Sequence, residues 1–177
     1  MRRAVFVVAL FLLASGEFRC AHAESPLGAE VANDALVRVC GYRRVWALGD
    51  RHYWGSVQRS MARESARYLI PISYLAAVIA SESTCDPEAR SRRGAVGLMQ
   101  VLPTGSAARG IDPLRFEEYS TNIHAGARHL KRCLEMCVDL LGAFGVYNGS
   151  KTCHAGRESS YAWRTFQLVL RAEGKRS

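Results

Sequence analysis

The sequence contains no convincing run of alternating apolar and polar residues, which is the pattern of a half-buried β-strand. It also has no internal repeat and no low-complexity tract, which excludes the repeat architectures. Apolar residues recur instead at helical spacing. Helices are predicted at residues 57–69, 72–83, 121–136, 139–146 and 160–171, with shorter ones at 30–39 and 103–109. We therefore predict a mainly α protein with a single helical domain and an appendage.

Motifs for a metal ion, an organic cofactor or nucleic acid are also missing. There is no CxxC pair and no His at ligand spacing from the cysteines, which argues against a zinc site. The arginines are scattered, with no clustered basic run and no patch interleaved with aromatic residues. We therefore expect no metal, no cofactor and no nucleic-acid partner.

Acidic residues are few, with 16 Asp and Glu against 24 Lys and Arg, so the formal net charge is +8. Residues 1–23 carry +2 of this charge, which leaves about +6 on the rest of the chain. A basic protein of this kind suits an acidic polymer such as the cell wall, or anionic lipid headgroups.

The N-terminus has the pattern of a secretory signal peptide. Met1-Arg2-Arg3 is followed by an apolar stretch, residues 4–14, that is too short for a comfortable membrane span. The preferred cleavage site follows Ala21-His22-Ala23, a cut near Ala14-Ser15-Gly16 is the second choice, and an uncleaved anchor is the alternative. We expect residues 1–23 to be removed, residues 24–56 to form an extension of uncertain structure, and the protein to reach the periplasm or cell envelope.

Export makes disulfides possible for the six cysteines. Cleavage after Ala23 leaves an odd number, so at least one cysteine would be free or would pair between chains. Cys133 and Cys137 share a face of a predicted helix and should reach elsewhere rather than bond to each other. The connectivity stays open.

The candidate chemistry begins with Glu82, in a helix rich in apolar residues. At about 100° per residue, Glu82 falls between Leu75 and Val78 on the helical wheel. A carboxyl on an apolar face is costly to ionise, so its pKa should rise and it can serve as a general acid. The alternative is a helix-end Glu that reaches solvent or pairs with an Arg.

Two further segments carry polar groups next to flexible backbone. In residues 94–100, two glycines three apart allow close approach to a ligand, and Gln100 can bond to sugar hydroxyl or acetamido groups. Tyr147-Asn148-Gly149 follows a predicted helix. Taken singly, each has a plain structural interpretation: a tight loop with Leu98 and Met99 in the core, and a turn with a buried Tyr.

Together and in this order, these segments resemble the catalytic domain of soluble lytic transglycosylases, which is related in fold to goose-type lysozymes. The family pattern is E-S, N/D-P, S-x-x-G-A-x-G-L-M-Q-x-x-P, N-I-x-x-G-x-x-Y-L and A-Y-N-A-G. The chain has Glu82-Ser83, Asp86-Pro87, Ser91 with Gly94 to Gln100 and Pro103, Asn122-Ile123, Gly126, His129-Leu130 and Val146 to Gly149. The resemblance covers residues 57–171, and we place the catalytic domain at 57–174.

The resemblance implies a lysozyme-like helical domain with a substrate groove, in which Glu82 is the catalytic acid and base. It places Ser83, Gly97, Leu98, Met99 and Gln100 in the sugar groove, with Tyr147 orienting or tuning Glu82 and Asn148 holding the turn at Tyr147. The chain departs from the pattern where His129 replaces the usual Tyr, Val146 replaces Ala, and Gly149-Ser150 replaces Ala-Gly.

The resemblance also implies a reaction that needs only one carboxyl group. Glycosidases commonly use two, but Asp86 precedes Pro87 and is read as a helix stop. Glu82 would protonate the glycosidic oxygen between N-acetylmuramic acid and N-acetylglucosamine. It would then take the proton of the sugar's 6-hydroxyl, which closes on C1 to form a 1,6-anhydro product.

We therefore expect a monomeric, disulfide-bearing peptidoglycan lytic transglycosylase acting on glycan strands. It would open the wall for an envelope-spanning secretion, pilus or conjugation apparatus. One alternative is a hydrolytic lysozyme on the same fold, with water in place of the 6-hydroxyl. The other is a non-enzymatic wall-binding scaffold protein.

Overall fold

The computed structural model describes residues 26–41 and 51–175, and the predicted signal peptide and Cys20 lie outside these ranges. Within them the chain forms seven α-helices and two short 3-10 helices and no β-strand, only isolated bridges around Val96. The predicted mainly α class is confirmed. None of the helices in the described ranges is long and apolar enough to cross a membrane.

The helices follow the predicted periodicity closely, and their ends differ by a few residues. In chain order they are α2 (Pro26–Cys40), α4 (Arg51–Tyr68), α5 (Ile72–Ser83), η1 (Ser106–Ala108), η2 (Pro113–Glu117), α6 (Tyr119–Met136), α7 (Leu140–Tyr147), α8 (Cys153–Arg157) and α9 (Ser160–Ala172). The helix expected at 103–109 is the short η1, and α4 begins six residues before the predicted start at Val57.

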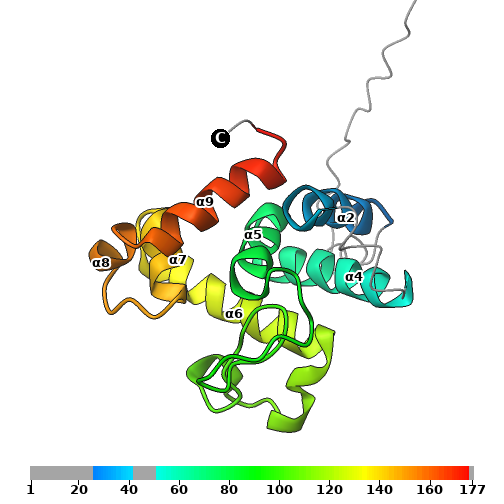
Figure 1. The fold of residues 1–177 in the computed structure, drawn as a ribbon, viewed down its shortest axis with the longest axis horizontal. Coiled ribbons are helices and arrows are strands. Elements are labelled where there is room, and N and C mark those ends of the chain that lie inside the picture. The colour runs from blue at the N-terminus through cyan, green and yellow to red at the C-terminus, as the bar shows by residue number, and fades with distance from the viewer. Residues whose placement is uncertain (1–25, 42–50, 176–177) are drawn as a thin grey trace, which may run out of the picture.

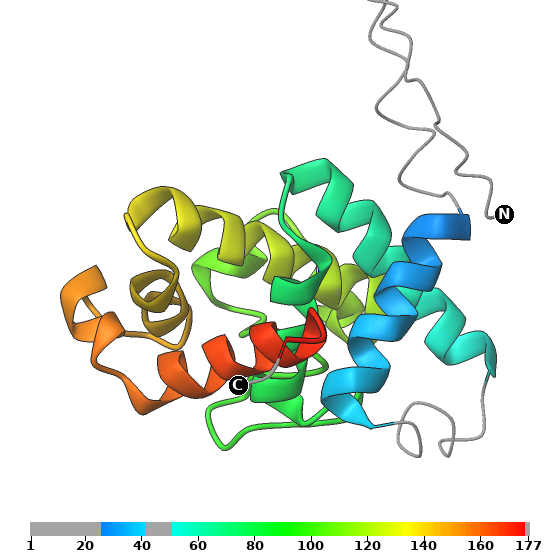
Figure 2. The same ribbon diagram turned by 90° about the horizontal axis from the view of Figure 1, so that it is seen from above.

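Helix α5 forms the centre of the fold, between α2 and α4 on one side and α9 on the other (Figure 1). Five successive residues, Leu75 to Ile79, are fully buried, so α5 is covered on all sides rather than along one stripe. Pro71 caps its N-terminus, where a missing N–H has no cost. α7 and α8 lie at the opposite end of the molecule from α2 and α4 (Figure 2).

The chain turns sharply where α5 ends. Thr84 and Cys85 both have positive φ, 50° and 65°, a conformation that residues with a Cβ adopt at a cost. Cys85 is bonded to Cys40 at the end of α2, with a Cα–Cα distance of 5.9 Å. The disulfide therefore joins the N-terminal extension to the end of the central helix, three residues after Glu82.

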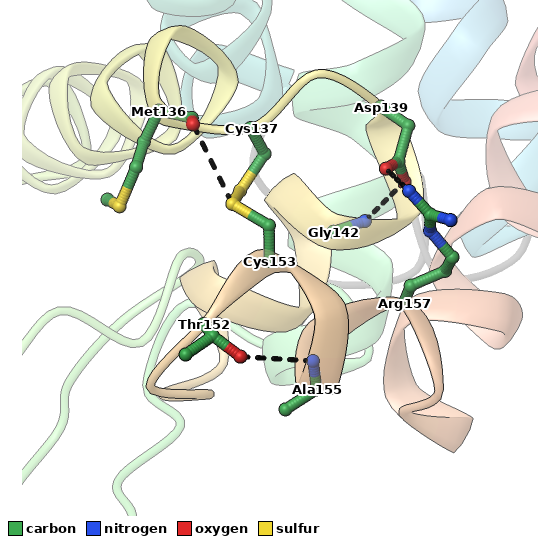
Figure 3. The surroundings of a disulfide bond; sticks show 8 residues. All are labelled: Met136, Cys137, Asp139, Gly142, Thr152, Cys153, Ala155 and Arg157. Carbon is green, nitrogen blue, oxygen red and sulfur yellow. Dashed lines mark hydrogen bonds and ion pairs between the residues drawn. A yellow bond between two sulfur atoms is a disulfide. The ribbon is translucent and has the colours of Figure 1, made fainter.

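The segment between α7 and α9, for which no helix was predicted, is partly helical. It contains α8, whose backbone lies directly on α7. The contact is so close that a Cβ added at Gly145 would overlap the backbone of Gly156. Figure 3 shows the supports of α8: Thr152 accepts from the Ala155 N–H at 3.2 Å, and Arg157 donates to Asp139 at 2.5 Å. Five residues carry too little periodicity to be read from sequence.

The second disulfide joins Cys137, just after α6, to Cys153 at the start of α8. Cys133 is buried and free. Cys133 and Cys137 therefore do not bond to each other, as predicted. The sequence could not show which cysteines bond to each other, because the two cysteines of each disulfide are brought together only by the packing of the helices.

A buried carboxylate, Glu64 on α4, holds α4 against α6. Its side chain is 1% exposed and contacts His124 of α6 at 2.8 Å, together with Arg63 and Arg67. Burial raises its pKa, but these three partners outweigh burial and the net pKa of Glu64 is lowered. The negative charge of Glu64 therefore stabilises the contact between α4 and α6.

Candidate active site

A cavity of about 410 Å³ lies between the end of α5, the middle of α6, the end of α7 and the loop before η1. Glu82, Gln100, Tyr147 and Asn148, four of the predicted site residues, line it. They come from three separate parts of the chain. The fold therefore brings together the segments that carried the family resemblance.

Glu82 is half-buried in the last turn of α5 and points its Oε1 at the hydroxyl of Tyr161 on α9, 2.6 Å away. Burial raises the pKa of Glu82, while the Tyr161 hydrogen bond and the nearby positive charge of Arg164 partly lower it again. The net direction is upward. Glu82 can therefore hold a proton at a higher pH than an exposed carboxyl, as predicted from the helical wheel.

Tyr161 is set opposite Glu82 by a second polar contact between the same two helices. Ser81 and Thr165 share a hydrogen bond of 2.8 Å between their hydroxyls. Residues 161 and 165 are one turn apart on α9, so both contacts fix the same register. Burial raises the pKa of Tyr161, with the Glu82 charge adding to it, so the phenol stays protonated and donates.

Tyr147 closes another side of the cavity but does not bond to Glu82. Its hydroxyl donates to the backbone oxygen of Met99 at 2.9 Å, which ties α7 to the loop of residues 94–100. Its burial raises its pKa, and the negative charge of Glu82 adds to this. Tyr147 therefore holds the loop beside Glu82, whereas Tyr161 makes the direct contact with the carboxyl.

His129 stands where the resembled motif has a Tyr, and it keeps an aromatic contact there. Its ring centroid lies 4.9 Å from that of Tyr147, and it lines the same cavity. Burial lowers the pKa of His129. The imidazole is therefore a neutral hydrogen-bonding group in the cavity near pH 7.

Asn122 of α6 holds the loop of residues 94–100 in place. It is 1% exposed, accepts from the Met99 N–H at 2.9 Å and donates to the Val96 oxygen at 2.8 Å. Gly97 has φ +74°, and a Cβ there would lie 2.5 Å from the Asn122 side chain. A Cβ at Gly126 would likewise meet the Met99 sulfur at 2.5 Å. These motif residues are therefore needed for packing.

The structure does not bring the other predicted residues to the cavity wall. Ser83 is buried and its hydroxyl donates to the Ile79 oxygen of its own helix at 3.0 Å. Leu98 and Met99 are 1% and 0% exposed, so their side chains belong to the core. Gly97 lines a neighbouring cavity on the other side of the loop.

Gln100 connects the two sides of this loop. Its φ is +46°, and its side-chain Nε2 donates to the backbone oxygens of Ala89 and Gly97 at 2.9 and 3.0 Å. These bonds occupy its amide N–H groups. What Gln100 offers to the cavity is therefore chiefly its amide oxygen.

Glu82 is the only carboxyl group that the described residues contribute to the cavity wall. Asp86, one turn further on, accepts from the Glu88 N–H at 2.9 Å and closes a turn. Nowhere in residues 26–41 and 51–175 do three His, Cys, Asp or Glu side chains come close enough to hold a metal ion. The chemistry that this wall offers is proton transfer at one carboxyl.

Sequence reasoning missed Tyr161 and Arg164, the two α9 residues that act on Glu82. The Arg164 guanidinium lies 5.8 Å from the centroid of the Tyr161 ring. The only local signal was a pair of polar atoms, on Tyr161 and Thr165, one turn apart on a helix face that is otherwise buried. Such a pair indicates a buried hydrogen bond without naming its partner.

Comparison with known proteins agrees with this arrangement. Residues 59–169, more than half of the chain, match the family described as Transglycosylase SLT domain. The chain therefore belongs to this family, which confirms the resemblance drawn from its motifs.

A curated relative is the protein named "Transglycosylase" of Enterobacteria phage PRD1, 33% identical over 89 residues. The match covers 48% of this chain and 31% of the relative, so the chain spans about a third of that protein's length.

Proposed function

We propose that this protein is a lytic transglycosylase that cleaves the β-1,4 bond between N-acetylmuramic acid and N-acetylglucosamine in peptidoglycan. The observation that carries the proposal is Glu82: a half-buried carboxyl with a raised pKa, paired with a buried phenol in a cavity that has no second carboxyl among the described residues. Membership of the transglycosylase SLT family supports the same reaction.

The reaction uses Glu82 twice. Protonated Glu82 donates its proton to the glycosidic oxygen, and the bond from that oxygen to C1 of the muramic acid breaks. The ionised Glu82 then takes the proton of the 6-hydroxyl of the same sugar, and its oxygen bonds to C1. The product is a 1,6-anhydro ring, no water is consumed, and Glu82 is protonated again.

Tyr161 and Tyr147 have different parts in this scheme. Tyr161 donates to Oε1, which leaves Oε2 to carry the proton that is transferred, and it stabilises the carboxylate that forms. Tyr147 positions the loop through the Met99 oxygen. His129 and the Gln100 oxygen are available to the sugar's hydroxyl and acetamido groups.

The test is mass spectrometry of muropeptides released from purified peptidoglycan. Wild-type protein should release 1,6-anhydro muropeptides, and Glu82→Gln should lower the rate by about 10²-fold or more, because general acid catalysis is lost. Glu135→Gln, on the exposed face of α6 and outside the cavity, is the matched control and should keep full activity.

Each other result has a definite meaning. Reducing-end products would identify a hydrolytic lysozyme instead. Full biological function of Glu82→Gln, with intact folding and wall binding, would favour a scaffold protein.

We further propose that the protein is exported. Two disulfides between described cysteines need an oxidising compartment, and the signal-like N-terminus supplies the route. Mass analysis of the protein from a periplasmic fraction should show cleavage after Ala23. A protein found in the cytoplasm with its N-terminus uncleaved would contradict this proposal.

The last part of the proposal is that cleavage is local and serves a secretion, pilus or conjugation apparatus. A basic protein is held close to the acidic wall, which favours action where it is released. Loss of the gene should then impair assembly of that apparatus while growth stays normal, and Glu82→Gln should reproduce the defect. Normal assembly in the deletion strain would contradict it.

A further inference from the structure

The loop beside Glu82 presents two consecutive arginines on a tight turn. The Gly94 N–H donates to the Ser91 oxygen at 3.0 Å, and the Ser91 N–H donates to the Ala95 oxygen at 2.9 Å. Gly94 has φ +81°, which closes the turn without steric cost. Arg92 and Arg93 occupy the two central positions, so the backbone holds them at defined places.

Only one of these arginines belongs to the cavity. Both side chains are exposed, but Arg93 lines the same wall as Glu82 and Gln100, whereas Arg92 does not line it. Arg93 is also the single Lys or Arg that the described residues contribute to this wall. The turn therefore places one positive charge at the cavity wall and a second, chemically identical one away from it.

Arg93 forms no ion pair with any carboxylate of residues 26–41 and 51–175. Three other surface arginines are paired: Arg90 with Glu117, Arg115 with Glu118, and Arg157 with Asp139. Glu82 begins the proposed reaction protonated, so it does not neutralise the charge. The cavity wall therefore carries a positive charge that its described residues leave uncompensated.

We propose that Arg93 determines specificity by binding a carboxylate of the stem peptide on the muramic acid, so that the cleft prefers glycan strands with acidic stem peptides. This rests on the proposed function. The glycan itself is uncharged where the lactyl group is amide-linked to the peptide. The stem peptide supplies the negative charge, and a guanidinium binds a carboxylate through two parallel hydrogen bonds.

The test compares two substrates that differ only in charge. One is uncross-linked, peptide-bearing strands with their amines acetylated. The other is the same strands after conversion of the carboxylates to primary amides with carbodiimide and excess ammonia. We expect wild-type protein to cleave the acidic strands with a kcat/KM about 5-fold higher, because an exposed ion pair contributes modestly. The preference should shrink at high salt.

The two arginines provide matched variants. Arg93→Gln should abolish the preference while keeping turnover of the amidated strands, Arg93→Lys should keep part of it, and Arg92→Gln should keep all of it. Equal loss in Arg92→Gln and Arg93→Gln, or an unchanged preference in Arg93→Gln, would overturn the assignment. So would wild-type protein that cleaves both substrates equally, a result that leaves the proposed function intact. Cleavage of neither substrate would contradict the proposed function itself.

Discussion

At the scale of single residues, the proton on Glu82 depends on a balance of opposing effects. Burial favours the neutral carboxyl, while the Tyr161 hydroxyl and the Arg164 charge favour the carboxylate. A group that must first donate and then accept a proton needs both forms within reach. The contact with Tyr161 is therefore expected to tune the reaction as well as to hold the side chain.

Replacing Tyr161 with Phe should test this balance. The variant removes a hydrogen bond that stabilises the carboxylate, so the pKa of Glu82 should rise further. Because the first step needs protonated Glu82, the alkaline limb of the kcat/KM profile should move to higher pH. We also expect kcat/KM to fall about 10-fold at its optimum, since the carboxylate formed in the first step is less stabilised.

Tyr74→Phe is the control for this measurement, because Tyr74 lies on α5 next to Phe144 and outside the cavity wall. Its pH profile should match that of the wild type. An alkaline limb that stays in place in Tyr161→Phe, or moves to lower pH, would contradict the assigned role.

The sequence could place Glu82 but could not find its partner. Glu82 lies in a helix whose apolar residues are local and readable, and the structure confirms that this helix is buried. Tyr161 lies 79 residues further along, on a helix that reads only as amphipathic. Its role arises from the packing of α5 against α9, which no local pattern encodes. The core positions of Leu98 and Met99 were stated only as an alternative, for the same reason.

At the scale of elements, the long helices and the eight-residue α7 were predicted well, but the five-residue α8 was not. α5, α6 and α9 each contain at least three turns, so their periodicity is clear. α8 has five residues and exists because its backbone packs on α7 through Gly145 and Gly156. The sequence does not show that these two glycines are in contact, because the contact depends on how the two helices pack.

Gly145→Ala should therefore destabilise the protein by about 2 kcal/mol or more, because the new Cβ would overlap the α8 backbone. Gly55→Ala is the matched control: it too lies within a helix, but its Cβ would meet only the flexible Arg59 side chain at 3.2 Å. We expect Gly55→Ala to be neutral or to stabilise by up to about 1 kcal/mol. Urea unfolding measures both, and equal effects of the two variants would show that α7 and α8 do not pack this closely.

At the scale of the whole molecule, the N-terminal extension is part of the folded structure where it is described. Ala32 and Leu36 of α2 are fully buried, and Cys40 is bonded to Cys85 at the end of α5. Only a short helix at residues 30–39 was predicted in this extension, and the rest of its structure was left uncertain, because the apolar periodicity there is short. The disulfide holds it to the segment that carries Glu82.

The double variant Cys40→Ala/Cys85→Ala should lower the free energy of unfolding by about 3 kcal/mol. The bond closes a loop over 45 residues of sequence separation, so its loss frees the unfolded chain. Denaturant unfolding under non-reducing conditions checks this value. Cys133→Ala, which leaves both disulfides in place, should cost about 1 kcal/mol, and an equal loss in the two variants would argue against the bond.

The sequence by itself determined the helical class, the burial of the helix with Glu82, and the family, because these depend on residues close together in the chain or in fixed order. Only the tertiary structure decided which motif residues reach the cavity, that Tyr161 is the partner of Glu82, which cysteines pair, and that Arg93 rather than Arg92 lies in the site. The reason is physical: each of these depends on the packing of elements against one another. Local propensity and periodicity carry no record of that packing.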